Sequence, residues 1–370
     1  MIAERDLRRR IGSARRVVVK IGSSAITSFD GGIRRPQLDA LADVCEARMT
    51  AGSDVFVVSS GAIGAGMSPL GMSTRPGTLA AKQAAASVGQ LELARAWGDS
   101  FARYDRVVGQ VLLTAGDVGR RESAANAQRT LDRLRTLRAV PVINENDTVA
   151  TNEIRFGDND RLAALVAHLT SSDALILLSD VDALYDADPR RGGASAVSMV
   201  AGADDLDGVV AGAGGALGTG GMASKLAAAR LAADAGIPVL LTSAELAERA
   251  LAGEPDVGTV FAPRPERMTA RRFWVRHAAD AHGAVVLDDG AVRAVTRSRR
   301  SLLLAGVTGV DGLFHFGDVI ELHGQAGDVV GRGIAQYDSI EVRGRLAERA
   351  SGSEIGQGRP LVHADDLVPV

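Results

Sequence analysis

The sequence predicts an α/β protein with a largely parallel sheet covered by helices, followed by a smaller β-rich domain. Apolar strands that end in small or polar residues alternate with helical segments through most of the chain, which is the rhythm of βαβ units. After Phe261 the composition changes: prolines and arginines come first, and then short β-like runs broken by glycines. We therefore expect a first domain over 1–262, a linker over 263–282 and a β-rich domain over 283–364.

Composition narrows the class of protein. The chain has 370 residues, of which 46% are hydrophobic and 24% charged, as in ordinary globular proteins. A formal net charge of −3 argues against a strongly basic nucleic-acid binder. The single cysteine, Cys45, has no disulfide or CxxC partner and is expected in the core of a helix. No uncharged apolar run is long enough to span a membrane, and we expect a cytoplasmic protein.

Two strand-to-helix turns lie near the start of the chain. Residues 16–21 form an apolar strand that Lys20 interrupts just before Gly22, where a backbone could approach a phosphate closely. The alternative is a plain strand end with a snorkelling lysine. A helix over about 36–50 leads to the second strand, which ends in Ser59, Ser60 and Gly61.

The most informative stretch follows a long alanine-rich helix over about 78–103 and a strand over about 107–113. An apolar run from Val140 ends in four polar residues, 144–147, and Asp158 or Asn159 is then expected to cap the next helix. In open α/β sheets, ligands sit beyond the carboxyl ends of the strands, so a small polar substrate is expected here. A solvated turn followed by an ordinary cap remains the alternative.

Two further segments complete the candidate site. The apolar strand over 174–179 has a polar exit at Ser179 and Asp180, and the glycine-rich residues 218–221 open a helix that runs to about Ala235. Such a loop offers unpaired backbone N–H groups and a positive dipole end to a phosphate; otherwise it is a flexible loop beside a surface lysine, Lys225. Neither GxxxxGK[ST] nor GxGxxG after a strand occurs, which disfavours P-loop NTPases and Rossmann dehydrogenases.

The residue types favour phosphoryl transfer. Lys20 and Lys225 belong to different strand-to-helix units but are expected on the same rim of the sheet, facing acidic and amide groups. Phosphoryl transfer asks the protein mainly for positioning and positive charge. No Ser/His/Asp or Cys/His set that would indicate nucleophilic catalysis stands out.

Taken together and in order, these motifs resemble the amino acid kinase family, and within it the kinases that phosphorylate free glutamate. The resemblance rests on VKIGSS from Val19, SSGAI from Ser59, PVINEND from Pro141, GDND from Gly157, LSD from Leu178 and GTGGMASK from Gly218. From about Gly283 onward the chain resembles the PUA domain found at the end of many bacterial members. The resemblance covers nearly the whole chain.

The resemblance implies an αβα sandwich, with a mostly parallel sheet, that uses ATP and Mg²⁺ to phosphorylate the γ-carboxylate of L-glutamate. It also implies that this reaction opens proline biosynthesis and that proline inhibits it at or overlapping the glutamate site. A homo-oligomer, dimer or tetramer, and a glutamyl phosphate reductase as the downstream enzyme belong to the same expectation. No protein ligand of the metal is assigned.

The resemblance also implies residue roles, carried over by position. Lys20, Lys225 and Asp160 form the catalytic group, in which Asp160 orients the two lysines. Glutamate is assigned to Ser60, Asp147 and Asn159. The nucleotide is assigned to Lys20, Ser179, Asp180, Thr219, Gly220, Gly221, Met222, Ala223, Ser224 and Lys225. Two departures are small: Ser179 stands where threonine is frequent, and Ala223-Ser224 replaces a more usual Ser-Thr or Ala-Thr pair, which could weaken one phosphate hydrogen bond.

Two other classes remain open. A sister kinase would act on acetylglutamate, aspartate or a nucleoside monophosphate, but the paired NEND and GDND motifs and the appended domain favour glutamate. An RNA-binding or RNA-modification protein is the second class, because PUA-like domains commonly bind RNA. Arg293 with the cluster Arg297–Arg300 would be its basic patch. The overall charge favours a solvated face for this cluster instead.

Overall fold

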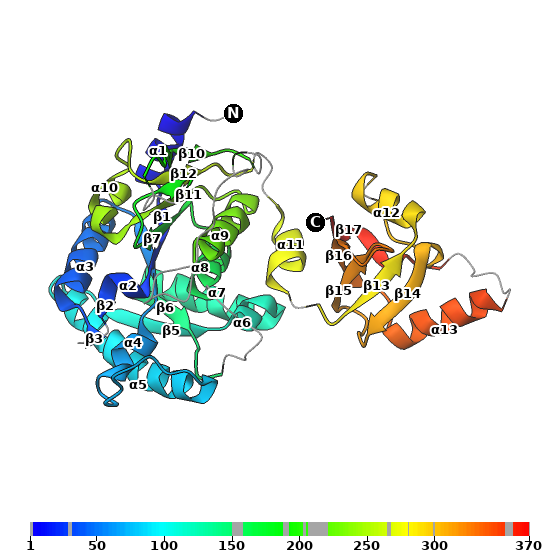
Figure 1. Cartoon of the computed structure of the whole chain (residues 1–370), viewed down its shortest axis with the longest axis horizontal. Coiled ribbons are helices and arrows are strands. Elements are labelled where there is room, and N and C mark those ends of the chain that lie inside the picture. Colours follow the sequence, from blue (N-terminus) through cyan, green and yellow to red (C-terminus); the bar gives the residue numbers. More distant parts are fainter. Residues whose placement is uncertain are drawn as a thin grey trace. The chain divides into compact units, whose positions relative to one another are not determined.

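The computed structural model describes residues 3–28, 32–149, 158–187, 192–202, 205, 221–264, 268–279, 281–298, 300–351 and 358–369. The chain divides into two compact units, Met1–Arg267 and Met268–Val370 (Figure 1). Each unit has its own sheet and its own hydrophobic core. No helix within the described ranges is both long and apolar enough to cross a bilayer.

The first unit is built on an eight-stranded, mostly parallel sheet, as the sequence predicts. At one edge β12 pairs antiparallel with β11 and parallel with β10, so β12 and β10 run opposite to the other strands. In spatial order the strands are β10 (Met199–Val200), β12 (Thr259–Phe261), β11 (Val239–Ser243), β7 (Ala174–Ser179), β1 (Arg16–Ile21), β4 (Asp54–Ser59), β6 (Val140–Glu145) and β5 (Val108–Leu113).

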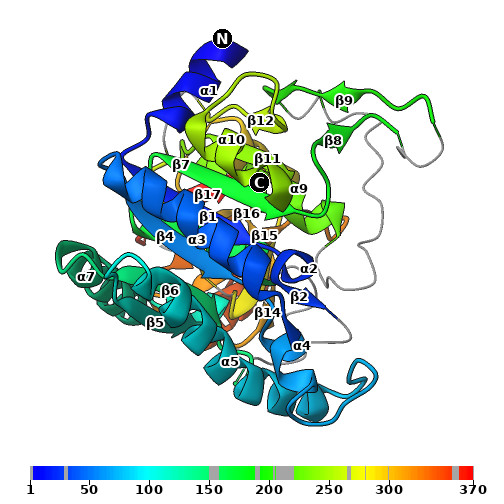
Figure 2. The same cartoon turned by 90° about the vertical axis from the view of Figure 1, so that its left-hand side faces the viewer.

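Helices cover both faces of this sheet, which makes the unit an αβα sandwich (Figures 1 and 2). Figure 2 looks onto one face, which is covered by α3 (Arg35–Thr50), α5 (Leu79–Ala102) and α10 (Ala247–Ala252). The opposite face is covered by α7 (Arg121–Thr136), α8 (Asp158–Leu169) and α9 (Met222–Asp234).

Shorter helices are α1 (Glu4–Gly12), α2 (Ser23–Ile26), α4 (Ala62–Met67), α6 (Ala115–Gly119) and the 3₁₀ turn η3 (Ala244–Leu246). Short strand pairs are β2 (Thr27–Ser28) with β3 (Gly32–Ile33), and β8 (Leu184–Tyr185) with β9 (Ala196–Val197).

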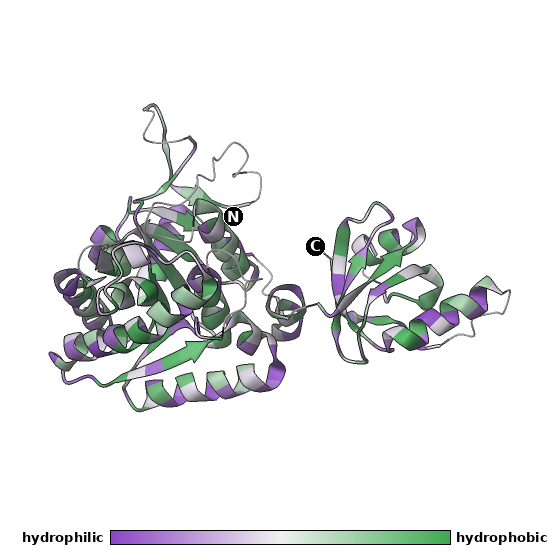
Figure 3. Ribbon diagram, turned by 60° about the horizontal axis from the view of Figure 1, so that its bottom comes forward, coloured by the Kyte–Doolittle hydropathy of each residue, from purple (hydrophilic) through white to green (hydrophobic). Residues whose placement is uncertain are grey.

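The central strands are apolar because both of their faces are buried. All six residues of β6 and of β7 are buried, and Figure 3 shows hydrophobic colour along the strands and hydrophilic colour on the outer sides of the helices. Side chains also fix where helices begin: Thr78 caps α5, and Thr114 forms a capping box with Asp117 at α6. Cys45 is buried in α3, as expected, and burial raises the pKa of its thiol to about 12.

Helices α4 and α5 touch through their backbones. A methyl group on Gly66 would overlap the carbonyl oxygen of Ala85, and one on Gly89 would overlap the carbonyl oxygen of Ala62. Glycine is therefore required at both positions, since a carbonyl group cannot swing aside as a side chain can. The contact holds α4, which begins just after the Ser60 turn, directly against the long helix α5.

The second unit contains a five-stranded sheet in the order β14-β13-β15-β16-β17. The strands are β13 (Gly283–Leu287), β14 (Val307–Gly312), β15 (Val319–His323), β16 (Val329–Ala335) and β17 (Val362–Pro369). Its helices are α12 (Asp289–Thr296), the 3₁₀ turn η5 (Leu304–Gly306) and α13 (Ser339–Ala350). The apolar run at Leu302 makes one isolated bridge to Val362 and continues as η5.

Part of the segment expected as a linker has regular structure. Ala270–Phe273 forms α11, and Trp274–Ala278 forms one turn of π-helix, η4. Val275 in this turn is fully buried and packs with Val319 and Val368 of the second unit. These contacts explain why the second unit begins at Met268 rather than at its first strand.

Candidate active site

Most of the predicted site residues lie at one edge of the first sheet. The strands β1, β4, β6 and β7 are parallel and in register, so their carboxyl ends finish side by side. Lys20 on β1 stands opposite Val58 of β4 and Leu177 of β7. The residues that follow these strands therefore surround one short stretch of the sheet edge.

A buried carboxylate joins the two lysines. Asp160, in the first turn of α8, is 2% exposed, and its Oδ1 lies 2.6 Å from the Nζ of Lys20. The Nζ of Lys225, in the first turn of α9, lies 4.0 Å from its Oδ2. The hydroxyl of Ser224 donates a 2.8 Å hydrogen bond to the same Oδ2. Asp160 therefore holds two buried cations from different strand-to-helix units next to each other.

The electrostatics of this group follow from burial and from its own charges. Burial alone would raise the pKa of Asp160, but the charges of Lys20 and Lys225 outweigh it and keep the pKa below its ordinary value. Burial lowers the pKa of Lys225, and the nearby Lys20 adds to this, while Asp160 and Asp180 oppose it. The group carries one surplus positive charge in a nearly dry place, where an incoming anion would be strongly attracted.

The amino end of α9 adds backbone donors to the site. Gly221 is the N-cap, in an extended conformation, and the carbonyl of Gly221 accepts a hydrogen bond from the Ser224 hydroxyl. In this first turn Ala223 is exposed and Met222 is half-buried. The first N–H groups of a helix lack partners inside it and attract anions. Thr219 and Gly220, which the sequence assigns to the nucleotide, lie outside the described residues.

Asn159 links α8 to the acidic strand end. Helix α8 already begins at Asp158, so Asn159 lies inside its first turn and does not cap it. Its Oδ1 accepts a hydrogen bond from the backbone N–H of Glu145 at 3.2 Å. Asn144 Oδ1 accepts from the same N–H, and the Nδ2 of Asn144 donates to the Oε1 of Gln90 at 2.6 Å. The end of β6 is thus tied to α8 on one side and to α5 on the other.

Hydrogen bonds to β1 and α5 fix the conformation of the turn at Ser60. The N–H of Ser60 donates to the carbonyl of Ile21, and Gly61 then takes a φ of 104°, which a side chain would oppose. The indole N–H of Trp97 on α5 donates a 2.9 Å hydrogen bond to the hydroxyl of Ser59, which itself donates to the carbonyl of Ser60. The conformation of the turn therefore depends on α5.

Two cavities open beside the site. One, of about 250 Å³, is lined by Ala86, Ser87, Gln90, Leu91, Gln110, Leu112, Glu145, Asn146, Asp147 and Thr148. The other, of about 450 Å³, is lined by Ser24, Ala25, Arg34, Gln37, Ala40, Leu41, Val44, Ser179, Asp180, Ser243, Ala244, Glu245, Ala247 and Glu248. Asp147 and Ser179 therefore open onto different cavities.

The described residues offer few protein ligands for the Mg²⁺ ion that the resemblance implies. In the part of the chain that the structure describes, no three His, Cys, Asp or Glu side chains converge as a cation cage. The Oδ1 of Asp160 is paired with Lys20, and its Oδ2 accepts from Ser224. Mg²⁺ commonly keeps several waters and uses substrate phosphates together with one or two carboxylates, which fits this donor set.

Sequence reasoning missed the supporting residues. Gln90 and Trp97 look like ordinary members of an alanine-rich helix, and Arg34 stands in a polar stretch before α3. No local pattern marks them, because their role depends on where α3 and α5 pack. The nearest usable signals were the one tryptophan and the second glutamine of the alanine-rich helix α5.

Comparison with known proteins places this geometry in a class. The profile of the amino acid kinase family matches residues 15–243, and that of the PUA domain matches residues 283–358. The chain belongs to the amino acid kinase family and ends in a PUA domain, and it is an enzyme of the kinase class.

Its relatives narrow the class further. It is 66% identical over 363 residues to a glutamate 5-kinase of Nocardia farcinica, covering 98% of this chain and 99% of that protein. It is 64% identical to a glutamate 5-kinase of Rhodococcus opacus, with the same coverage of both chains. A glutamate 5-kinase of Mycolicibacterium smegmatis is 60% identical, with 98% of each chain covered.

Proposed function

We propose that this chain transfers the γ-phosphoryl group of ATP to the γ-carboxylate of L-glutamate, giving L-glutamyl 5-phosphate. The observation that carries the proposal is the buried arrangement of Lys20, Asp160 and Lys225 at the edge of the sheet. The activity that names its relatives, and their similarity over nearly the full chain, supports glutamate as the acceptor.

The chemistry needs charge more than it needs a base. A glutamate carboxylate has a pKa of about 4.3, so it is already a nucleophile at neutral pH. The obstacle is its repulsion from the anionic γ-phosphoryl group, roughly 4 kcal/mol for two unit charges about 4 Å apart at an effective dielectric constant of about 20. Lys20 and Lys225 oppose that repulsion, and the buried Asp160 holds them in place. Bound with ATP, Mg²⁺ would supply further positive charge at the phosphates.

The proposed binding roles follow the two sides of the site. Ser60, Asp147 and Asn159 bind glutamate, on the side that α5 and the end of β6 form. Residues 219–225, with Ser179 and Asp180, bind the nucleotide. An ammonium group needs an acidic or carbonyl partner when it leaves water, and Asp147 supplies one to free glutamate.

The wider proposals follow from glutamate as substrate. The product would enter proline biosynthesis in the cytoplasm, where a glutamyl phosphate reductase would consume it, and proline would inhibit the kinase at or overlapping the glutamate site. We also propose a homo-oligomer, dimer or tetramer. RNA binding by the PUA domain remains a prediction. Arg293, Arg297 and Arg300 are exposed on or next to α12. Exposure fits both an RNA-binding basic patch and an ordinary solvated surface.

One assay tests the proposal. Acyl phosphates react with hydroxylamine, so ATP-dependent hydroxamate formation can be compared for glutamate, acetylglutamate and aspartate, with ADP release measured for nucleoside monophosphates. We expect the highest kcat/KM with glutamate by a wide margin. A preference for acetylglutamate would assign the chain to a sister activity, because Asp147 would then face an acceptor without a cation.

A further inference from the structure

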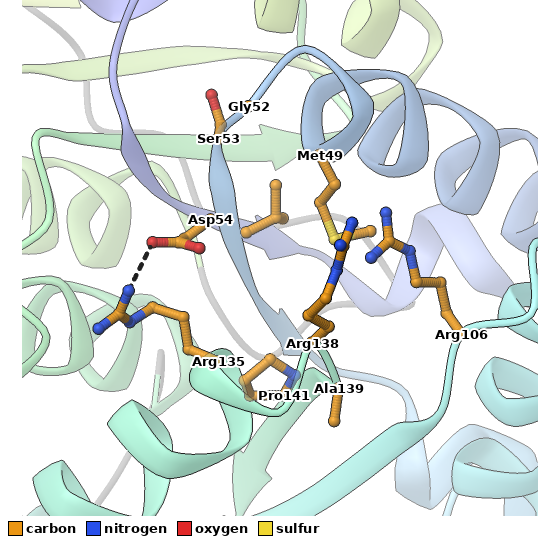
Figure 4. Close-up of a pocket in the computed structure, with 10 residues that line it drawn as sticks. Met49, Gly52, Ser53, Asp54, Arg106, Arg135, Arg138, Ala139 and Pro141 are labelled. Atoms are coloured by element: carbon orange, nitrogen blue, oxygen red, sulfur yellow. Dashed lines mark hydrogen bonds and ion pairs between the residues drawn. The ribbon is translucent and has the colours of Figure 1, made fainter.

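A basic pocket lies at the amino ends of the strands, at the opposite edge of the sheet from the buried lysines. It has a volume of about 230 Å³ and is lined by Met49, Gly52, Ser53, Asp54, Val55, Arg106, Arg135, Arg138, Ala139 and Pro141 (Figure 4). Asp54 begins β4 and Ser59 ends it, so roughly 17 Å of strand separates this pocket from the Ser60 turn. The mechanism above uses none of its residues.

Two of its three arginines are already paired. Arg106 makes hydrogen bonds of 2.9 and 2.8 Å to the two carboxylate oxygens of Glu46. Arg135 donates to Asp54 at 3.1 Å and also lies 3.5 Å from Asp132. Their positive charges are therefore balanced within the protein.

The guanidinium of Arg138 has no such partner. Arg138 is exposed, and among the described residues its side chain makes no hydrogen bond or ion pair, although its charge contributes to lowering the pKa of Glu46. Figure 4 shows its guanidinium beside that of Arg106 and next to Met49, while Arg135 points away toward Asp54. Because only one of these two neighbouring guanidinium groups is paired with a carboxylate, the other is open to an anion that enters the pocket.

The backbone of Arg138 adds a second, independent observation. Helix α7 ends in a Schellman motif, in which the N–H of Arg138 donates to the carbonyl of Arg135 and that of Ala139 donates to Leu134. This motif requires a left-handed residue, and Arg138 has a φ of 61°. Glycine or asparagine is the usual residue there, and arginine adopts this left-handed conformation at some cost in backbone energy. What it adds to the pocket is its side chain.

We propose that this pocket binds a small organic carboxylate, whose head pairs with Arg138 and whose carbon body lies against Met49, Val55 and Pro141. A guanidinium fork matches a carboxylate in two parallel hydrogen bonds. The one unpaired guanidinium fits a single carboxylate, and the apolar lining fits a short carbon chain better than a bare inorganic ion. The proposal does not depend on which substrate the kinase phosphorylates.

Butyrate is the probe, and the melting temperature of the whole chain is the readout. We expect a saturable rise of roughly 2–5 °C at about ten times Kd, because a ligand that binds only the folded state stabilises it. Sodium chloride at equal ionic strength should give no saturable rise. No saturable response to butyrate, or saturation by inorganic phosphate alone, would overturn the proposal.

Variants locate the site. Arg138→Met should abolish the butyrate response, and Arg138→Gly should do the same while keeping the left-handed cap. Arg133→Met is the matched control, because Arg133 lies on the same helix, is exposed and does not line the pocket. Lys20→Met tests the alternative that the butyrate carboxylate binds at the buried lysines of the active site. If the response survives loss of the Arg138 guanidinium, or disappears with Lys20→Met, the pocket is not the binding site.

Discussion

The two ends of the parallel sheet in the first unit handle charge differently. At the carboxyl ends, two lysines share one carboxylate, and Lys20, Asp160 and Lys225 are each less than a tenth exposed. At the amino ends, arginine pairs such as Arg106 with Glu46 have a carboxylate each, and their side chains are less deeply buried. The charges of the buried group cannot be removed one at a time without leaving a neighbour unbalanced, whereas those at the amino ends are separable. The lysines at the carboxyl ends therefore act as one charged group, whereas most charges at the amino ends are paired separately.

Loss of either lysine should give the largest effect. We expect Lys20→Met or Lys225→Met to lower kcat by roughly 10²–10³-fold or more, since removing one preorganised charge from a transition state costs about that much. The KM for glutamate should change much less, because the charge acts on the transferring phosphoryl group. Steady-state kinetics by the hydroxamate assay measure both values. A variant with near-normal kcat would remove that lysine from the mechanism.

Loss of the shared carboxylate should come next, and it should change the pH profile. In Asp160→Asn the two lysines lose their counter-charge, so the pKa of Lys225, already lowered by burial, should fall further. Lysine then loses its proton at a lower pH, and the alkaline limb of the kcat profile should move toward neutral pH, with kcat lowered roughly 10²-fold. An unchanged alkaline limb would mean that Asp160 does not hold the lysines charged.

A change on the glutamate side should act on binding. Asp147→Asn keeps the shape of the side chain and removes its charge. We expect the KM for glutamate to rise by roughly 10–100-fold, because a hydrogen bond to a charged group contributes about 1.5–3 kcal/mol. The KM for ATP should barely move, which serves as the internal control. Equal glutamate affinity in the two proteins would show that Asp147 does not meet the substrate's ammonium group.

The smallest effect is expected at the amino ends, and on stability. Burial would raise the pKa of Glu46, but hydrogen bonds from Arg106 and Thr50 and the charges of Arg106 and Arg138 lower it below its unfolded value of 4.5. The ionised form therefore stabilises the fold above that pH, and its contribution is lost as pH falls through the folded-state pKa.

The test is Glu46→Gln, whose destabilisation should be about 1–3 kcal/mol near neutral pH. Urea unfolding, followed by tryptophan fluorescence, measures the difference from wild type. That difference should shrink below pH 4.5. A difference that stays constant with pH would show that packing, not charge, is what the substitution removes.

Sequence reasoning succeeded where the rule is local. Strand ends in a parallel sheet meet at one edge, so the apolar run that contains Lys20 and the polar end at Asn144 were enough to indicate a common site. It failed where contacts depend on packing between distant segments. Gln90 and Trp97 reach the site only because α5 lies across the ends of β4 and β6, and no spacing along α5 shows that. In the sequence Asn159 looks like a helix cap, because asparagine is common at caps. Its side chain instead binds the backbone at the end of β6, which the residue type alone does not reveal.

The basic pocket was missed for the same physical reason. Arg138 follows a helix at a position where sequence rules look for glycine, so the arginine indicates only an irregular end. Its partners in the pocket come from α3 and from the segment before β5, far away in the chain. The pocket beside the Arg138 guanidinium exists only once these segments meet.

The backbone contact between α4 and α5 also limits how this sequence can diverge. Most buried positions tolerate change because a neighbour can shrink, grow or rotate in return, and lineages drift through such paired replacements. Gly66 and Gly89 face carbonyl groups, which every amino acid carries, so no second replacement can open space for a side chain there. Descendants of this sequence should therefore keep both glycines while the residues around them vary, and the Ser60 turn is inherited together with the helix that supports it.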